Sequence, residues 1–367
     1  MSKKRGVIEI QFNWIFVLIV GGLIILFFLG VVRTQKKVAE TKISATISTD
    51  LRAILSGVEV STQTASLIDI PKTEIEFDCE GYRVGGIGGM RPIASFSPNL
   101  IKSNKLMSWA VPWSVPYRVM NLVYLTSPDV RYIIVDDSGA VGDDSLADKL
   151  YSTLPQDLVV EDGQERLLMN KEIILDGVDP GDKNNYKVRY VFFKNNPSMI
   201  PNIPPYFDKL RGDVTAIEIG PIPAGSLEGY GKIIFYKQES GAFDFAKSDE
   251  TESTIYYFGK PSLIAAIFAE DVDSYTCNMQ RAFKKLWFIT KIYLDRTNAL
   301  KNSLDLPMDC DSSYTPGIGF LETIRDNAVL SSQGPLISAD ILPISNATPS
   351  LADKNDMAQK LSCPEIY

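Results

Sequence analysis

The sequence of 367 residues contains no histidine, and this absence excludes a large part of enzyme chemistry. Histidine is the side chain that most often moves protons near neutral pH, and it completes Ser-His-Asp and Cys-His catalytic sites. It is also a ligand in most catalytic zinc sites. We therefore expect a protein that is not an enzyme and that holds no cofactor.

Cysteine is scarce: the four cysteines are Cys79, Cys277, Cys310 and Cys363. No CxxC motif occurs, which argues against a zinc ribbon or a thioredoxin-type site. An even number predicts two disulfides in an oxidising compartment, with three pairings open and four buried free thiols as the alternative. A straight helix over 275–304 would be about 44 Å long. The chain from 304 to 310 spans at most about 20 Å, so a Cys277–Cys310 bridge would require a break in that helix.

Positive charge is too sparse for a nucleic-acid partner, because 37 Lys and Arg stand against 45 Asp and Glu. Nucleic-acid binding needs a basic stripe, so we expect no nucleic acid. Residues 1–37 carry six basic groups and one acid, a net charge of +5. Since the whole chain carries −8, residues 38–367 carry −13.

Charge is missing altogether from Ile10 to Val32, a run of 23 residues without an ionisable side chain. As a helix this run is about 34 Å long, enough to cross a hydrocarbon core of about 30 Å. A buried core helix and a cleaved secretory signal are the alternatives. A signal has an apolar region of about 7–15 residues that ends in small residues, whereas this run continues directly into Arg33. The sequence therefore predicts a single-pass, uncleaved anchor with the lipid bilayer as its partner.

The orientation of this anchor is not decided by its flanks, because three basic residues lie on each side, at 3–5 and at 33, 36 and 37. An acidic domain gains nothing from a negatively charged cytoplasmic leaflet. Paired cysteines also fit an oxidising compartment. We expect the cell membrane as the location, with a cytoplasmic N-terminus and an extracytoplasmic main domain.

Helical spacing continues beyond the apolar run, with apolar residues at 43, 47, 51 and 54 or 55. The predicted organisation is a cytoplasmic basic tail at 1–7, a transmembrane helix continuing as an amphipathic stalk over 8–56, and an extracytoplasmic domain over 57–367. A soft boundary is expected near Pro128. The amphipathic half must bury its apolar stripe against this domain or against another chain.

Period-two spacing follows from Val58 onward and predicts a strand-rich region. We predict strands at 75–79, 131–135, 187–193, 214–219, 232–236, 254–258 and 263–269. We predict an irregular aromatic segment at 109–116 and helices at 145–154, about 273–304, 321–330 and 352–361. Strands followed by helices indicate an α+β or a three-layer α/β domain.

Four acidic residues follow the predicted strand 131–135: Asp136, Asp137, Asp143 and Asp144. Carboxylates at the carboxyl end of a strand lie where α/β proteins place ligands, and their oxygens suit Mg²⁺ or Ca²⁺. They are weak metal candidates, and on them rests the alternative of a membrane-anchored metal-dependent hydrolase. Solvated loop acids beside the helix at 145 explain the pattern equally well.

Other patterns have a structural and a functional interpretation. The cluster Gly85, Gly86, Gly88 and Gly89 predicts a flexible hairpin, with a phosphate-binding loop as the alternative. Basic residues along the helix at 281–291 predict a solvated face rather than an anion site. Asn346-Ala347-Thr348 is a glycosylation sequon, and Asn346 can be glycosylated only if the domain is extracytoplasmic.

The segment Lys4-Arg5-Gly6, followed by Val-Ile-Glu-Ile-Gln-Phe and a long apolar helix, resembles the class III signal of archaeal type IV pilin-like proteins. This resemblance implies cleavage after Gly6 and a role in assembly for Glu9, with the first helix in a filament core beside other subunits. The family's glutamate usually lies fifth after the cut, whereas Glu9 is third and Gln11 is fifth. The rest of the chain resembles uncharacterised single-pass archaeal membrane proteins.

These observations give three hypotheses. The first is a single-pass membrane-anchored surface protein whose extracytoplasmic domain has a structural or binding role. The second is a pilin-like minor subunit processed after Gly6. The third is the anchored metal-dependent hydrolase described above.

Overall fold

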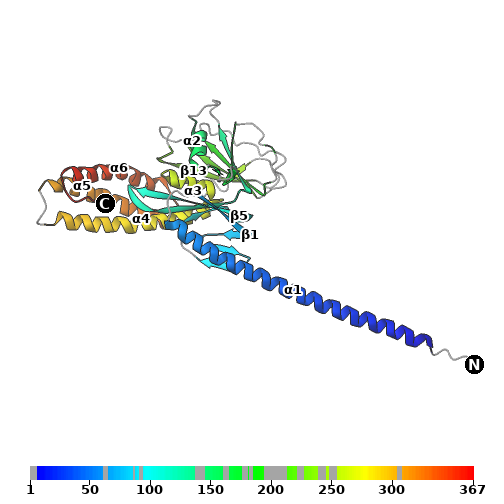
Figure 1. The fold of residues 1–367 in the computed structure, drawn as a ribbon. Helices are drawn as coiled ribbons and strands as arrows, with labels where there is room; N and C mark the ends of the chain where they lie inside the picture. Colours follow the sequence, from blue (N-terminus) through cyan, green and yellow to red (C-terminus); the bar gives the residue numbers. More distant parts are fainter. Residues whose placement is uncertain are drawn as a thin grey trace, which may run out of the picture.

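The computed structural model describes residues 6–60, 65–85, 87–90, 94–136, 145–159, 165–175, 181, 185–193, 213–220, 227–238, 245–247, 254–303 and 308–367. They form an α+β head with two main β-sheets, from which one long N-terminal helix projects (Figure 1). The two ends of the chain lie far apart, with the N-terminus at the tip of this helix and the C-terminus in a layer of helices.

The long helix is α1, Gly6–Val60, which confirms the single continuous helix predicted from the spacing. The prediction that the strand region begins at Val58 was wrong, because α1 continues through Gly57 to Val60. One glycine inside a helix costs only about 1 kcal/mol and does not end it by itself.

The first sheet, sheet A, has the strand order β3-β2-β1-β5-β6-β4 and is antiparallel except for the pairing of β4 with β6. Its strands are β1 Ala65–Phe77, β2 Gly81–Val84, β3 Ile87–Met90, β4 Ser95–Phe96, β5 Leu100–Val115 and β6 Tyr117–Thr126. One face of this sheet receives the second half of α1.

Strand β5 corrects the prediction of an irregular segment at 109–116. The register of β1 against β5 ends at Ala65 opposite Trp109, so in the described chain the rest of β5 pairs with β6 alone. Pro112, which lacks an N–H group, is tolerated in a strand with one unpaired edge. Tertiary pairing therefore overrides the local proline signal.

The second sheet, sheet B, has the order β10-β7-β11-β12-β13-β14, with β15 also paired to β13. The first four strands are parallel, and β13 runs antiparallel to its three neighbours. The strands are β7 Val130–Asp136, β10 Asn170–Leu175, β11 Lys187–Phe193, β12 Val214–Ile219, β13 Tyr230–Gln238, β14 Phe245–Lys247 and β15 Thr254–Phe258. A small hairpin joins β8 Leu158–Val159 to β9 Glu165–Arg166.

The helices of the head are α2 Leu146–Thr153, α3 Lys260–Phe268, α4 Val272–Lys301, α5 Asp311–Ser331 and α6 Ser338–Lys360, with a 3₁₀ turn at Met308–Cys310. The prediction of a strand at 263–269 was wrong, because this segment is α3. Residues 262–268 are all buried, and an apolar run buried on every side has no period that separates helix from strand. Prolines inside α5 and α6 explain why the pattern indicates only their second halves.

One main core connects the two sheets with the helical layer. The ring of Phe268 at the end of α3 lies 5.2 Å from that of Tyr124 in sheet A and 5.5 Å from that of Tyr132 in sheet B. Pro128 lies in the turn between β6 and β7, which belong to different sheets. The head thus changes sheets at this turn while its core remains continuous.

Candidate functional site

The first half of α1 is the most unusual surface of the protein. Its large apolar side chains are exposed, among them Trp14 at 70%, Leu23 at 62% and Phe27 at 68%. This helix is long and apolar enough to cross a membrane, and no part of the chain that the structure describes buries its most apolar stretch. It suggests a membrane anchor, because water would meet apolar side chains on every face.

The second half of α1 packs onto sheet A. Ile47, Leu51 and Leu55 are at most 3% exposed, and they join the buried side chains of β1, β2, β5 and β6. The hydroxyl of Tyr82 donates to the carbonyl oxygen of Ser48 at 2.8 Å, which fixes the β2–β3 hairpin to the helix. The amphipathic half therefore buries its stripe against the head, one of the two outcomes that the sequence left open.

A segment between Val32 and Ser44, which we call the bare segment, separates the apolar half of α1 from the half that packs onto the head. Among the side chains of α1 that the structure describes, the first buried one is Ser44, twelve positions after Val32 and about 18 Å farther along the helix axis. In this segment the basic residues Arg33, Lys36 and Lys37 are all exposed. If the apolar run lies in lipid, the head is held off the membrane surface by this length.

The two residues that the pilin resemblance singles out, Gly6 and Glu9, both lie in the first turn of α1. The side chains of residues 1–13 are outside the described part of the structure. Cleavage after Gly6 and the role of Glu9 therefore stay predictions.

The four cysteines form two disulfides, Cys79–Cys277 and Cys310–Cys363. Helix α4 is continuous from Val272 to Lys301, which agrees with the argument against a Cys277–Cys310 bridge. The first bridge joins sheet A to α4, and the guanidinium of Arg281 donates to the carbonyl oxygen of Cys79 beside it. Two disulfides suggest that the head lies outside the cytoplasm.

The proposed metal loop is only partly described. Asp136 is the last residue of β7 and is 7% exposed, while Asp137, Asp143 and Asp144 lie outside the described residues. Among the residues that the structure describes, no group of three or more His, Cys, Asp or Glu side chains could hold a metal ion. The metal site on these four aspartates therefore stays a prediction.

The glycine cluster is a hairpin, as predicted: β2 and β3 pair from Gly81 opposite Met90 to Val84 opposite Ile87. Packing explains two of its glycines. Gly85 has a φ of +56°, and a Cβ there would lie 2.3 Å from the Ser44 hydroxyl oxygen of α1. A Cβ on Gly89 would lie 2.4 Å from the ring of Tyr82.

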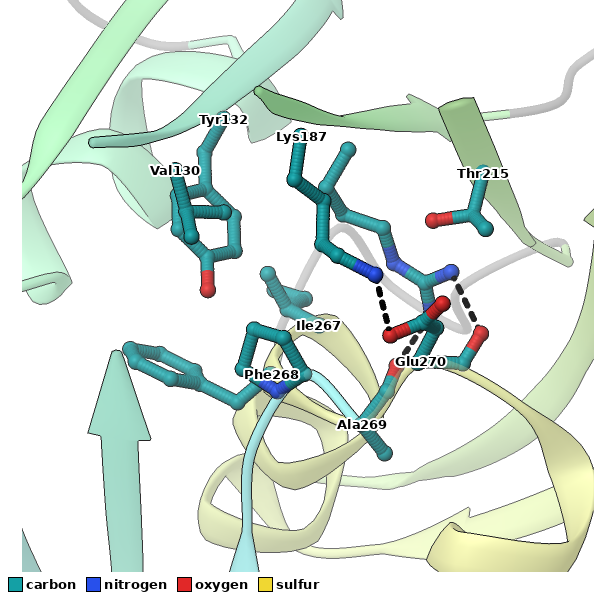
Figure 2. A pocket seen from close by; sticks show the side chains of 10 residues that line it. Val130, Tyr132, Lys187, Thr215, Ile267, Phe268, Ala269 and Glu270 are labelled. Atoms are coloured by element: carbon teal, nitrogen blue, oxygen red, sulfur yellow. Dashed lines mark hydrogen bonds and ion pairs between the residues drawn. The ribbon is translucent and has the colours of Figure 1, made fainter. Parts of the chain in front are cut away.

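A small charged junction lies where α3 meets the amino ends of the parallel strands (Figure 2). The guanidinium of Arg189, which is 3% exposed, donates to the carbonyl oxygens of Ala266, Ala269 and Glu270 and so caps α3. The ammonium of Lys187 lies 2.7 Å from a Glu270 carboxylate oxygen. That same oxygen accepts a hydrogen bond from the backbone N–H of Asn99 near β5.

This junction is a structural brace rather than a ligand site. Its free space is about 10 Å³, room for one water molecule. It lies at the amino ends of β7, β11 and β12, whereas open α/β sheets bind ligands at the carboxyl ends. Burial lowers the pKa of Arg189 to about 10, so the guanidinium stays charged at neutral pH. Sequence reasoning missed this junction, because lysine and arginine in a strand resemble an ordinary solvated face.

The remaining candidates are surface residues. Asn346 is exposed on α6, and the hydroxyl of Thr348 in its sequon donates to the carbonyl oxygen of Ile344. Lys284, Lys285 and Lys291 are exposed on α4, in agreement with the predicted solvated face. Arg281, the fourth basic residue of that prediction, is partly buried and donates to the carbonyl oxygen of Cys79 instead.

No family model, curated protein or solved structure matches the chain.

Proposed function

We propose that this chain is a single-pass membrane-anchored surface protein. Its apolar helix half lies in the lipid, its N-terminus is cytoplasmic, and its head lies outside with a structural or binding role. The observation that carries the proposal is the exposed apolar half of α1, which is continuous with a half that is packed onto the head.

A structural or binding role is consistent with the described contacts of the head. The cavity at the charged junction has about 10 Å³ of free space, room for one water molecule. Arg189, whose pKa is lowered by burial, caps α3 and does not face an open cleft. Two disulfides stabilise the head where reduction by the cytosol is absent.

Extraction of isolated membranes with alkaline carbonate tests the anchor. A protein held by a transmembrane helix stays in the membrane pellet, whereas one held by surface contacts is released. Protease added to intact cells tests the orientation, because it should remove the head while leaving a short protected fragment that contains the apolar run. Release by carbonate, or a head that resists protease until the cells are lysed, would contradict the proposal.

The second candidate is a type IV pilin-like minor subunit processed after Gly6. It is favoured by the helix architecture: α1 continues from Gly6 without a break, and its second half packs onto an antiparallel sheet. In that case the apolar half contacts the same half of other subunits after assembly. The departure at Glu9 and Gln11 from the family spacing weighs against it.

The intact mass of the purified chain separates the two candidates. A mature chain that begins at Val7 supports the pilin-like subunit, and a variant in which Gly6 is replaced by valine should then keep the longer N-terminus. A chain that begins at Met1 or Ser2 discards the pilin-like subunit and leaves the simple anchor.

A further inference from the structure

The part of α1 where the apolar run ends carries a groove, which we name the α1 groove. Its volume is about 410 Å³, within the range of about 300–1,000 Å³ that small-molecule sites have. The residues that line it are Leu26, Phe27, Gly30, Val31, Thr34 and Gln35. This part of α1 projects from the head, and no other described element lies beside it (Figure 1). The α1 groove is therefore open to whatever surrounds the helix.

The α1 groove has an apolar end and a polar end. Leu26 and Phe27, which are 66% and 68% exposed, lie inside the uncharged run, whereas Thr34 and Gln35 lie beyond it. Gly30 lies between them, and nothing is within 4 Å of a Cβ built there, so no side chain fills the middle. The Thr34 hydroxyl donates to the carbonyl oxygen of Gly30 at 2.9 Å, so its proton is already used. A ligand that matches this groove is apolar at one end and polar at the other.

Positive charge lies at the polar end of the α1 groove. Arg33, Lys36 and Lys37, which we name the collar, are all exposed. Arg33 is three positions after Gly30, and Lys37 is three positions after Thr34, so both are helical neighbours of groove residues. Among the side chains that the structure describes, no carboxylate pairs with Arg33 or Lys37. The polar end of the ligand is therefore expected to be an anion.

The collar has the depth of lipid headgroups if the uncharged run lies in the hydrocarbon core. The headgroup layer on each side of a bilayer is about 5–8 Å thick. Arg33 lies about 1.5 Å and Lys37 about 7.5 Å beyond Val32 along the helix axis, so both lie within this layer. Lys42 is also exposed, but it lies about 15 Å beyond Val32 and thus outside the layer.

The acidic head does not cancel the charge of the collar. Residues 38–367 carry a net charge of −13. However, the packing of α1 onto the head begins at Ser44, about 18 Å beyond Val32, which is about two Debye lengths at physiological ionic strength. The bare segment thus separates the negative head from an anion bound at the collar.

We propose that the α1 groove and the collar bind one anionic phospholipid from the leaflet on the head side of the membrane. An acyl chain lies along Leu26, Phe27 and Gly30, and the lipid phosphate accepts hydrogen bonds from Arg33 and Lys37. This inference rests on the membrane anchor proposed above. A second copy in parallel orientation fits the groove less well, because it brings two collars of like charge together.

Native mass spectrometry of the full-length chain in detergent micelles tests the headgroup contact. The probes are phosphatidylglycerol and phosphatidylcholine with identical acyl chains. R33Q and K37Q should each bind phosphatidylglycerol about fivefold more weakly than the wild type, because one basic residue near an anionic surface contributes about that factor. Their binding of phosphatidylcholine should be unchanged. K42Q is the control matched to K37Q, and it should bind both lipids as the wild type does.

A second pair of variants tests the groove itself. Gly30→Leu fills the groove and should weaken the binding of both lipids about fourfold, the effect of losing the burial of roughly one methylene group. Gly21→Leu is the matched control, because a Cβ there also has nothing within 4 Å and Gly21 does not line the groove. The basic residues at positions 3–5 are the same in every variant, so their own lipid contacts cancel in the comparison.

Four results would overturn this lipid site. Two of them are equal binding by K37Q and K42Q, and equal binding by Gly30→Leu and Gly21→Leu. The third is displacement of phosphatidylglycerol by inorganic phosphate at constant ionic strength, which would show that the collar holds free phosphate. The fourth is a dimer that Gly30→Leu abolishes, which would assign the groove to a second copy. Carbonate extraction of all these variants should match the wild type, so the anchor is judged separately.

Discussion

The two halves of α1 are one helix with two different environments. In the first half Leu26 is 66% exposed, and in the second half Leu51 is 1% exposed, although both are leucines in the same regular structure. The difference lies in what surrounds them: sheet A covers Leu51, and no described part of the molecule covers Leu26. Helix formation therefore does not explain the apolar run, whereas the lipid environment that we propose for it does.

The two halves of α1 also differ in what they contribute: the second half to the folding stability of the head, the first half to the location of the protein. The second half of α1 is part of the folding of the head, because its side chains complete a core with β1, β2, β5 and β6. The first half contributes nothing to that core, so its apolar sequence is explained by insertion into lipid or by contact with other copies. Changes in the first half should alter location, and changes in the second half should alter unfolding.

The largest expected effect comes from placing charge in the first half. Leu23→Arg with Phe27→Arg should cost about 5–7 kcal/mol of insertion, from roughly 2.5–3.5 kcal/mol for each arginine near a helix centre. The variant should lose its place in the membrane fraction during flotation in a density gradient, while its head keeps the wild-type melting temperature. A matched Leu23→Ala/Phe27→Ala variant should float with the membranes. Flotation of the arginine variant equal to that of the wild type would contradict the lipid assignment.

Removal of a disulfide should destabilise the head and leave the anchor unaffected. Cys310→Ser with Cys363→Ser opens a loop with a sequence separation of 53 residues, which predicts a loss of about 4 kcal/mol of unfolding free energy. Chemical denaturation in detergent measures this loss, and carbonate extraction should be unchanged. A loss below about 1 kcal/mol would show that α4, α5 and α6 hold together without the bridge.

In the second half of α1, Leu51→Ala should lower the unfolding free energy by about 3 kcal/mol, because it leaves a cavity between α1 and sheet A. The control is Val38→Ala on the bare segment, where the side chain is 60% exposed and the effect should stay below about 0.5 kcal/mol. Thermal unfolding of both variants gives the comparison. Equal effects would mean that α1 does not pack onto the head.

The pH dependence of unfolding should report on the head alone. Burial raises the pKa of the Tyr257 hydroxyl to about 12, against 10 for an exposed tyrosine. Folding favours the protonated phenol, so this contribution to stability is complete below pH 10 and is lost between pH 10 and 12. The loss is roughly 2.7 kcal/mol. Tyr257→Phe should unfold with a flatter profile in this range, and an unchanged slope would contradict the burial of the hydroxyl.

The smallest expected effect concerns the contact between the hairpin and α1. Gly85→Ala should cost about 1–2 kcal/mol, because alanine disfavours a φ of +56° and its Cβ would meet the Ser44 hydroxyl. Gly88→Ala is the matched control, since nothing lies within 4 Å of a Cβ there. The denaturant midpoint of Gly85→Ala should be lower than that of Gly88→Ala. Equal midpoints would contradict the close contact between Gly85 and Ser44.

The sequence predicts the order of most helices and strands, and it fails where distant parts of the chain decide the local structure. Alternation and spacing predict β11, β12 and β15 with their observed ends, because glycine, proline or asparagine lies beside each strand in the sequence and no competing pattern occurs. Helix α3 was wrongly predicted as a strand. Because it is buried on every side, its apolar residues do not recur with the helical period. Strand β5 was hidden by Pro112, whose effect depends on a partner strand far away in the sequence.

The candidate sites also differ in whether a local sequence signal marks them. Local signals were sufficient for the hairpin at Gly85 and for the anchor helix. The Lys187–Glu270 junction depends on residues 83 positions apart, and no local signal marks it.

Cysteine scanning of α1 tests the central claim most directly. All four native cysteines are in disulfides, so one introduced cysteine is the only free thiol. In intact membranes, a membrane-impermeant maleimide should label Val38→Cys from the outer side and leave Leu23→Cys and Leu26→Cys unlabelled until detergent is added. Labelling of Leu23→Cys as fast as Val38→Cys before detergent would show that water surrounds the apolar half, and the anchor would be wrong.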